Sequence, residues 1–370
     1  MEMLLLLLSP TFGMHQYTAD LANRLAAAGE RVHLLTTVGY PADRYAPGVQ
    51  VHTPVRTRDS GFSLRGARPA PLAAIMRAID DAHPDMVHIT GPHLWNVPVL
   101  RALARRGVPT VHTLHDLQPH RGSPYGSLLL LWNRQVLRHA DQVVVHARAA
   151  SAAARRLDAR AAVTPLPLLH GFWGYALEAE ASRLAAQATP PDTPLALFFG
   201  RIERYKGLDV LLTAWTMAHG RLPAGSRLVL AGRGKLARLW RQPLPPGVEV
   251  VGRHIADREA LDLFAGCSLL VLPYTGATQT ALVAAAAHFR KSVVVSNSGA
   301  LAEDVVPGET GWVVPAGDSE ALSAALVEAL GDPGRLRAMG VANRAWYDAT
   351  RRVEWEMWRA LYARLIAREG

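Results

Sequence analysis

The sequence predicts an α/β protein built from two doubly wound parallel sheets in tandem. Short apolar runs rich in β-formers alternate with helical patterns along the whole chain, which is typical of parallel layers with helices on both faces. The order starts over in the second half. The 370 residues, 49% hydrophobic and 19% charged, are enough for two domains with a core each. Open sheets of this kind bind ligands beyond the carboxyl ends of their strands, so a crevice between the two domains is the expected site.

The first half begins with an apolar strand, a turn at residues 10–13 and a helix. Tyr17, Leu21 and Leu25 mark one face of that helix, and Gly29 follows its end in the C′ position. Further elements follow in sequence order. Strands are predicted at Met3–Leu8, Val32–Leu35, Asp85–Ile89, Val108–Leu114 and Gln142–Val145, with a helix at Leu128–Arg138.

The second half repeats this alternation and ends in a long aromatic helix. Strands are predicted at Leu195–Phe199, Leu228–Ala231, Val248–Val251, Leu269–Leu272 and Val293–Ser296, and helices at Leu208–Met217, Arg258–Phe264, Ala281–His288, Ser319–Leu330 and Arg344–Ala367. Scattered prolines between Thr164 and Pro194 place the domain junction there. The predicted domains are therefore residues 1–172 and 190–345, joined by a linker at 173–189, with residues 346–370 as a C-terminal helix.

Composition excludes several classes of protein. The run Leu4–Leu8 is far shorter than a membrane span and lacks the flanks of a signal peptide, so it is read as a first buried strand. Cys267 is the only cysteine, which excludes an internal disulfide and indicates a reducing, cytoplasmic compartment. No zinc finger, aromatic RNA-binding strand or basic heptad region is present, so no nucleic-acid partner is expected.

The positive charge is concentrated in the first half of the chain. The formal net charge is +9, and residues 1–176 hold 18 arginines and no lysine against 11 acidic residues. Such a surface suits anionic lipid or a phosphorylated substrate, whereas scattered solvated arginines are the plainer interpretation. Leu128–Leu131, followed by Arg134 and Arg138, is either an amphipathic membrane-surface patch or a buried crossover helix.

The loop after the strand Leu195–Phe199 carries the strongest chemical signal. Gly200 lets the backbone approach a ligand, and Arg201 and Lys206 project two cations from the carboxyl end of the strand. Two fixed cations suit a diphosphate leaving group, whose charge grows as the bond to it breaks. A surface salt-bridge loop is the structural alternative.

This loop, Gly-Arg-x4-Lys-Gly, resembles the motif of the large retaining GT-B glycosyltransferase family whose hallmark is Glu-x7-Glu, the family 4-like group. The opening segment from Pro10 to Thr37, the segment LVLAGRGK and the segment PAGDSEALSAALVEALGD are similar to the same family in the same order. The resemblance implies two Rossmann-like domains that face each other across a cleft, with the C-terminal helix crossing back to the first domain. It also implies a nucleotide-sugar donor bound by the second domain, a sugar, lipid-linked or small-molecule acceptor bound by the first, retention of anomeric configuration, and no metal or other cofactor.

The resemblance assigns further residues in the first domain. Gly13 is the close-approach residue of the first strand-to-helix turn, where helix amides face donor phosphates; a plain turn glycine is the alternative. His115, at the carboxyl end of a central strand, resembles the family histidine near the transferred sugar, and Asp116 and His15 are assigned to the acceptor or sugar side. Alternation along the strand sends His112 and His115 to opposite faces, so the spacing of His112, His115 and His120 predicts no metal site.

The segment that should carry Glu-x7-Glu departs from the family pattern. Ala277 and Ala285 occupy the two glutamate positions, and Thr278-Gln279-Thr280 resembles a family variant of this loop. The loop still opens a helix. Gln279, the Thr280 hydroxyl and the amide of Ala281 are therefore predicted to bind the donor, with simple N-capping as the alternative.

Two other positions complete the prediction. Arg253, in Gly252-Arg253-His254, follows a strand at the place where family members hold the base, although an ordinary loop fits the sequence equally. Glu303 resembles a family glutamate and is predicted to be architectural.

The loss of both glutamates keeps other functions open. A catalytically silent sugar-nucleotide-binding homologue or partner subunit is one alternative, and a nucleotide-sugar epimerase of the same fold is another. A phosphorylase lacks support because its cofactor lysine motif is absent. A nicotinamide-dependent oxidoreductase is disfavoured because no Gly-x-Gly-x-x-Gly follows the first strand.

Overall fold

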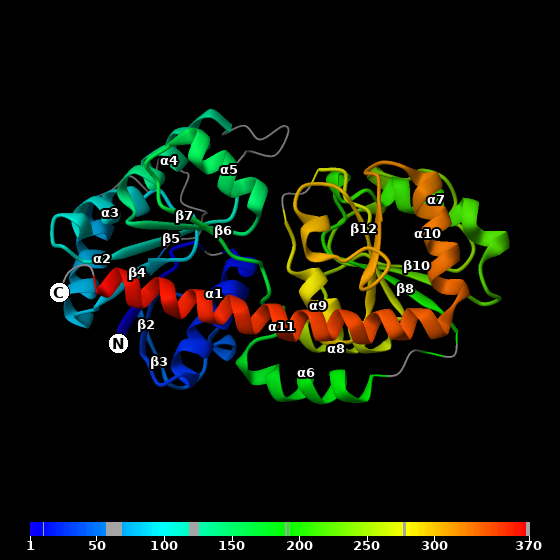
Figure 1. Ribbon diagram of the computed structural model, residues 1–370, viewed down its shortest axis with the longest axis horizontal. Coiled ribbons are helices and arrows are strands. Elements are labelled where there is room, and N and C mark those ends of the chain that lie inside the picture. Colours follow the sequence, from blue (N-terminus) through cyan, green and yellow to red (C-terminus); the bar gives the residue numbers. More distant parts are fainter. Residues whose placement is uncertain are drawn as a thin grey trace. The chain divides into compact units, whose positions relative to one another are not determined.

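The computed structural model shows two compact units (Figure 1). It describes residues 1–9, 11–56, 69–117, 126–188, 191, 193–276 and 279–367. Unit 1 comprises Met1–His170, Gly174–Ala176 and Val353–Gly370, and unit 2 comprises Gly171–Trp173 and Leu177–Arg352. The chain therefore leaves unit 1, forms unit 2 and contributes its last segment to unit 1 again.

Unit 1 is a seven-stranded, all-parallel sheet in the order β3-β2-β1-β4-β5-β6-β7. Its elements, in sequence order, are β1 (Glu2–Leu6), α1 (Phe12–Ala27), β2 (Arg31–Thr37), β3 (Val49–Val55), α2 (Pro69–Ala82), β4 (Met86–Ile89), α3 (Asn96–Ala104), β5 (Thr110–Leu114), α4 (Gly126–His139), β6 (Gln142–Val145), α5 (Arg148–Leu157) and β7 (Val163–Pro165). They are joined by the second half of α11 (Pro333–Ile366).

Right-handed crossovers decide which helices cover which face of this sheet. The strands β4 to β7 step in one direction, so α3, α4 and α5 lie on one face, and α2 shares it because β3 to β4 steps the same way. One apolar cluster joins these helices to the strands and includes Leu100, Trp132 and Ala154. The step from β1 to β2 runs the other way, which places α1 on the opposite face beside α11.

The sheet face under α1 and α11 is polar although it is buried. Alternation points Val143 and Val145 of β6 into the apolar cluster and leaves His146 for the other face. There the His88 ring joins the Tyr362 hydroxyl of α11 at 2.9 Å to the Thr113 hydroxyl at 2.8 Å. Thr113 in turn lies 3.0 Å from the hydroxyl of Tyr17 on α1. A continuous hydrogen-bonded chain thus runs from α11 through the sheet to α1.

A buried ion pair fixes α11 to unit 1. Glu354 accepts a hydrogen bond of 2.7 Å from Arg24 of α1 and another of 2.6 Å from the indole N–H of Trp358. The Arg24 guanidinium also lies 4.5 Å from the ring centroid of Trp355. Because both oxygens of this carboxylate are used, its burial is compensated.

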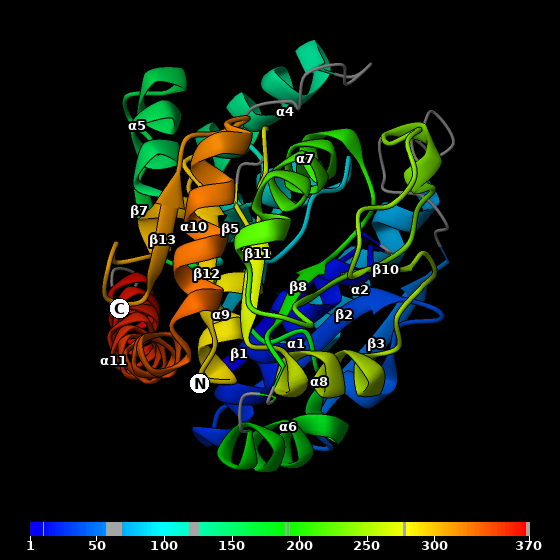
Figure 2. The same cartoon turned by 90° about the vertical axis from the view of Figure 1, so that its right-hand side faces the viewer.

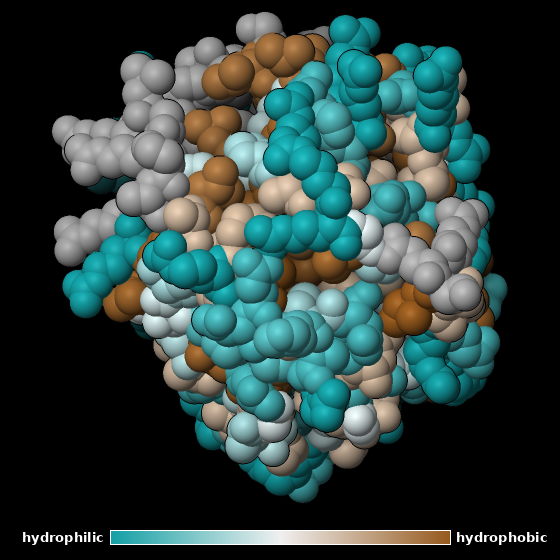
Figure 3. Space-filling model, turned by 90° about the vertical axis from the view of Figure 1, so that its left-hand side faces the viewer, coloured by the Kyte–Doolittle hydropathy of each residue, from teal (hydrophilic) through white to brown (hydrophobic). Residues whose placement is uncertain are grey.

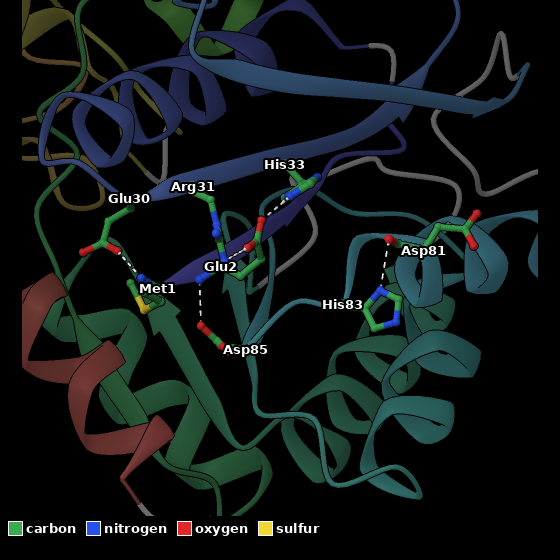
Figure 4. Close-up of polar contacts among 8 residues, drawn as sticks. All are labelled: Met1, Glu2, Glu30, Arg31, His33, Asp81, His83 and Asp85. Atoms are coloured by element: carbon green, nitrogen blue, oxygen red, sulfur yellow. Dashed lines mark hydrogen bonds and ion pairs between the residues drawn. The ribbon is translucent and has the colours of Figure 1, made fainter.

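The amino end of the sheet is held by its own polar contacts (Figure 4). The terminal amine of Met1 pairs with Glu30 at 2.8 Å, and the backbone N–H of Glu2 donates to Asp85 at 2.7 Å. The Glu2 carboxylate lies 2.5 Å from a ring nitrogen of His33. These contacts join the starts of β1 and β2 to the segment that enters β4, at the edge opposite the carboxyl ends of the strands.

Unit 2 is a six-stranded, all-parallel sheet in the order β10-β9-β8-β11-β12-β13 (Figure 2). Its elements are α6 (Tyr175–Gln187), β8 (Leu195–Phe199), α7 (Leu208–Ala218), β9 (Arg227–Ala231), β10 (Val248–Val251), α8 (Asp257–Gly266), β11 (Leu269–Leu272), α9 (Leu282–His288), β12 (Ser292–Ser296), β13 (Gly311–Val314), α10 (Ser319–Gly331) and the first half of α11. The helices α7 and α10 pack against each other on one face, and α8 and α9 follow crossovers that place them on the other.

The fold class predicted from the sequence is confirmed: both units are parallel α/β sheets of the Rossmann-like type. Strands β6, β8, β10 and β11 have their predicted bounds. The predicted elements omit β3, whose Pro54 and polar residues are unusual for a strand, and the short β7 and β13. The segment 173–189, predicted as a linker, contains the helix α6.

Other differences concern helix ends. The helix α11 begins at Pro333, eleven residues before the predicted Arg344, because proline is favourable in a first turn. The helix α1 begins at Phe12, so Gly13 lies in its first turn rather than in a loop, and the predicted turn residue Pro10 lies outside the described residues. No helix in the described ranges is long and apolar enough to cross a membrane.

The ion pair at α11 gives a first prediction. Replacing the buried Glu354 with alanine leaves the Arg24 guanidinium and the Trp358 indole without their acceptor, which costs about 3–5 kcal/mol. Hydrogen exchange at the amides of residues 353–366 is expected to speed up strongly. The matched control is Glu356→Ala, two residues along the same helix and exposed to solvent. Equal exchange rates in the two variants would show that the pair does not hold this helix.

Candidate functional site

The carboxyl ends of β8 and β11 form the point in unit 2 where the strand order reverses. β8 lies between β9 and β11, so the chain leaves β8 toward β9 while the chain from β11 continues toward β12. Helices on opposite faces diverge from such a point, and the loops above it remain accessible to a ligand. The sequence-predicted cations Arg201 and Lys206 follow β8 directly.

Close backbone contacts pack the loops of three strands together. Gly207 has φ of +67°, and a Cβ there would lie 1.9 Å from the carbonyl oxygen of Pro273 in the loop after β11. The N–H of Thr275 donates to the Tyr205 carbonyl at 2.8 Å. Gly232, after β9, has φ of +148°, and a Cβ there would lie 1.9 Å from the Gly200 carbonyl. Only glycine fits these two positions.

This packing brings Lys206 onto an aromatic surface. Its ammonium nitrogen lies 3.7 Å from the ring centroid of Tyr274, which is fully buried, and 5.1 Å from that of Tyr205. A cation above an aromatic face is attracted by the ring quadrupole, and the rings remove water from its surroundings. Tyr274 is therefore a support for the lysine that sequence reasoning missed.

Arg201 lies near Lys206 but is mostly solvated. Its side chain is 67% exposed, pairs with Glu203 at 2.9 Å and donates to the Tyr205 hydroxyl at 3.3 Å. The salt-bridge loop considered from the sequence is thus present, within a loop that also holds the two cations close together.

The electrostatics of Lys206 follow from this environment. Burial, and then the neighbouring charge of Arg201, lower the pKa of Lys206 to about 7, while Glu203 opposes the shift. The lysine is therefore poised between its charged and neutral forms near neutral pH. An anion bound beside it favours the ammonium form.

The remaining donor-side candidates of unit 2 lie at the start of α9 and after β10. Thr280 precedes Ala281, the N-cap residue of α9, and its hydroxyl accepts a hydrogen bond of 3.3 Å from the Leu282 N–H. Gln279 and Ala281, on either side of it, are half-buried. The Arg253 guanidinium makes two hydrogen bonds of 2.7 Å with the Glu259 carboxylate, which the sequence analysis did not foresee.

Of the two positions that hold glutamate in the family, the structure describes the second and not the first. Ala285 lies in α9, fully buried in the apolar core of unit 2. Ala277 lies outside the described residues, as does Thr278. Glu303 lies in a short helical turn after β12 and is exposed.

In unit 1, aromatic side chains gather where β5 and β6 end. His115 is half-buried, and its Nε2 donates to the Thr90 carbonyl at 2.9 Å. The Tyr17 ring packs edge-on against His115 and His146, with centroids 4.9 and 5.2 Å apart. Burial lowers the pKa of His115, although Thr90 and the nearby Asp116 oppose the shift. The neutral ring with a proton on Nε2 leaves Nδ1 as its acceptor nitrogen.

His146 has an unusual hydrogen-bond state. Its Nδ1 donates to the Leu166 carbonyl at 3.2 Å, and its buried Nε2 has no hydrogen-bond partner among the described residues. Burial, and then His115, hold the pKa of His146 well below its ordinary value. As strand alternation predicted, His112 lies on the other face, 3.0 Å from the Asn96 amide.

The other first-unit candidates occupy separate positions. His15 is buried in α1, and its Nδ1 shares a hydrogen bond of 2.7 Å with the Tyr45 hydroxyl. Burial, and then Arg44, lower the pKa of His15 to about 4. Asp116 is exposed, and Gly13 has open space where a side chain would lie. Within the described part of the chain, no three His, Cys, Asp or Glu side chains are grouped as a metal site requires.

Comparison with known proteins covers both units. Residues 12–169 match the family described as "Glycosyl transferase 4-like domain", and residues 193–332 match "Glycosyl transferases group 1". Sucrose-phosphate synthase from Thermosynechococcus elongatus has a similar fold, with a TM-score of 0.77 and 22% identity over 99% of both chains. This chain is a glycosyltransferase of the GT-B fold.

Two other relatives of this glycosyltransferase help to define it. The D-inositol 3-phosphate glycosyltransferase of Streptomyces scabiei is 28% identical over 90% of this chain and 82% of its own length. HepE of Anabaena, solved in complex with UDP, has a TM-score of 0.71 and 17% identity, over 98% of this chain and 100% of its own. The similarity therefore extends over both units and is not limited to one sheet.

This glycosyltransferase contains few lysines, so the titration of Lys206 can be measured by NMR without overlap from many other lysine signals. The chain has three lysines, Lys206, Lys235 and Lys291. NMR of protein labelled with ¹³C at lysine Cε is expected to show one resonance that titrates with a midpoint of about 7 and disappears in Lys206→Met. A Lys206 resonance that titrates only near the ordinary lysine pKa, roughly 10.4, would contradict the desolvated site.

Substitutions at Tyr274 test the support under the lysine. Leucine keeps the apolar cover but removes the aromatic face that favours the cation, so Tyr274→Leu is expected to lower the Lys206 midpoint further. Tyr274→Phe keeps the face and is expected to leave the midpoint unchanged. A higher midpoint in the leucine variant would mean that burial by the ring, and not its quadrupole, dominates.

Proposed function

We propose that this glycosyltransferase takes its sugar from a nucleoside-diphosphate donor whose diphosphate binds Arg201 and Lys206. The observation that carries this is the pair of neighbouring cations at the end of β8, one of them half-buried on Tyr274 with a pKa of about 7. Glu203 pairs with Arg201 and supplies one negative charge beside the two cations. A bound diphosphate would supply the further negative charge that Arg201 and Lys206 can accommodate.

The comparisons support the donor class. HepE, which shares the fold, was also solved in complex with UDP-glucose. A uridine-diphosphate hexose is therefore the first donor to test. We place Gly200, Arg253, Gln279, Thr280 and Ala281 on the donor side of unit 2, where Arg253 would exchange part of its contact with Glu259 for the ligand. Gly13, in the first turn of α1, is proposed for the donor phosphates as well.

In the proposed reaction, the bond between the anomeric carbon and the β-phosphate oxygen breaks. The acceptor oxygen bonds to the same face of that carbon, so configuration is retained, and the acceptor proton leaves with the nucleoside diphosphate or to solvent. Arg201 and Lys206 stabilise the charge that develops on the departing diphosphate, a task that requires no metal when two cations perform it. The proposal includes no bound cofactor.

Unit 1 is proposed to bind the acceptor. His115, with Nδ1 as acceptor, would hold a sugar hydroxyl, and Asp116 and His15 belong to the same side. Curated relatives carry the name D-inositol 3-phosphate glycosyltransferase. A phosphorylated polyol is therefore the proposed acceptor class.

One observation favours a second candidate function. Ala285 occupies the position of the family's second glutamate and provides no carboxylate. Its side chain is buried in the core of unit 2. A sugar-nucleotide-binding homologue without turnover would show donor binding and no product. The two functions are distinguished by measuring both quantities on the same preparation.

Thermal shift with a panel of UDP-, GDP-, ADP- and dTDP-sugars tests donor binding. A ligand present at 100 times its Kd stabilises by about 2.7 kcal/mol, which raises Tm by several degrees. One class of donor is expected to do so in the wild type. Absence of any shift across the panel would remove the donor proposal.

Transfer in the double variant Arg201→Ala/Lys206→Ala tests the roles of the cations. Removing one such donor group typically costs 10²–10³ in rate, so the double variant is expected to lose at least roughly a thousandfold. Arg204→Ala, an exposed cation in the same loop, is the control and should retain transfer. Near-normal turnover in the double variant, with donor binding intact, would refute the assignment.

A further inference from the structure

Three of the four helices on the outer face of unit 1 carry positive charge and no acidic residue. The helices α3, α4 and α5 lie on one face of the sheet and contain no Asp or Glu. Their six arginines are exposed: Arg101, Arg134, Arg138, Arg148, Arg155 and Arg156. An ordinary solvated surface mixes both signs of charge. Three consecutive helices whose charged residues are all positive therefore indicate a surface that binds an anionic partner.

The arginines on and beside α4 (Arg101, Arg134 and Arg138) have no acidic partner among the described residues. Arg101 donates to Gln135 at 2.7 Å and to His139 at 3.1 Å, both neutral partners on α4. In the described part of unit 1, neither Arg134 nor Arg138 forms an ion pair with a carboxylate. Burial, and then the charges of Arg101 and Arg138, lower the pKa of His139.

Exposed leucines lie on the same stripe of α4 as these charges. Leu128 is 43% exposed and Leu131 is 57% exposed. Spacings of three, three and four residues place Leu128, Leu131, Arg134 and Arg138 on one side of the helix, while Trp132 and Val136 point into the core. Figure 3 shows the molecule from the left-hand side of Figure 1, with apolar side chains near the upper rim.

We propose that this face of unit 1, defined by Leu128, Leu131, Arg134, Arg138 and Arg101, docks on an anionic lipid surface. Arginines beside an apolar ridge match a bilayer interface, where phosphate groups meet acyl chains. A nucleic acid would use the cations but gives the leucines no apolar surface to enter. The inference is independent of the transfer chemistry, since none of these residues belongs to the proposed donor or acceptor side.

Vesicle co-sedimentation of the full chain tests the docking. Binding is expected to vesicles with about one third phosphatidylglycerol and not to pure phosphatidylcholine, and to weaken in high salt because the charges are screened. Arg134→Gln/Arg138→Gln is expected to weaken partitioning by roughly tenfold or more, at about 1 kcal/mol for each charge. Leu128→Gln/Leu131→Gln is expected to weaken it by a similar factor at unchanged charge.

Unit 2 offers a matched control. Leu244 is 44% exposed and lies near the exposed Arg238 and Arg241. The triple variant Leu244→Gln/Arg238→Gln/Arg241→Gln should bind vesicles as the wild type does. Circular dichroism and the donor-induced thermal shift check that each variant is folded.

A fluorescent probe separates insertion from charge attraction. Cys267 is the only cysteine and is buried, so a thiol-reactive NBD dye labels Leu131→Cys selectively. Its emission is expected to rise and shift to shorter wavelength with anionic vesicles, whereas Leu244→Cys gives no change. Equal responses at the two positions, no response at position 131, or vesicle binding that the leucine variants leave intact would overturn the proposal. The last result would indicate a face for a soluble polyanion.

Discussion

The close packing of the loop after β8 against the loop after β11 is the constraint on which the candidate site of unit 2 depends. Gly207 lies so near the Pro273 carbonyl that no Cβ fits between them, and the Thr275 N–H completes the contact by donating to Tyr205. Lys206 directly precedes Gly207, and its ammonium group lies on the ring of Tyr274. The backbone contacts thus bring the loop that carries the cation to an aromatic support.

A lysine in such a place lowers the stability of the unliganded protein, and this cost is informative. Removing water from an ammonium group beside a second cation disfavours the charged form, as the lowered pKa of Lys206 reflects. Local arrangements that cost stability are concentrated at functional sites. An anion bound beside Lys206 would favour its charged form and offset the lost hydration.

Unit 1 depends on a different kind of interior. Its sheet has one apolar face, under α2 to α5, and one face where His88, Thr113 and His146 are buried beneath α1 and α11. Buried polar groups are usually hydrogen-bonded, and the chain from Tyr362 through His88 and Thr113 to Tyr17 supplies partners for two of these three, while His146 donates through Nδ1 to the Leu166 carbonyl. The last segment of the protein is thus required to complete the interior of the first unit.

Much of this organisation could be predicted from the sequence. Apolar runs bounded by turn residues gave the bounds of β6, β8, β10 and β11, because a buried parallel strand needs little more than a continuous apolar stretch. The pairing of Arg201 and Lys206 on one loop was also visible, since both lie within a few residues of a strand end. The helix α6 was missed: its alanine, leucine and glutamate residues favour a helix, but the prolines on either side of it led to the prediction of a domain junction.

The sequence by itself determined the two parallel α/β sheets, the rarity of lysine and the acid-free run of helices, since these depend on residue type and local periodicity. Tertiary structure decided that Tyr274 lies under Lys206, that Arg253 is held by Glu259, and that Tyr17 packs against both His115 and His146. Such partners come from different loops and helices, and no local pattern encodes a contact that exists only once the strands are in register. The identity of the side chains is local information, but the distances between them are a property of the folded chain.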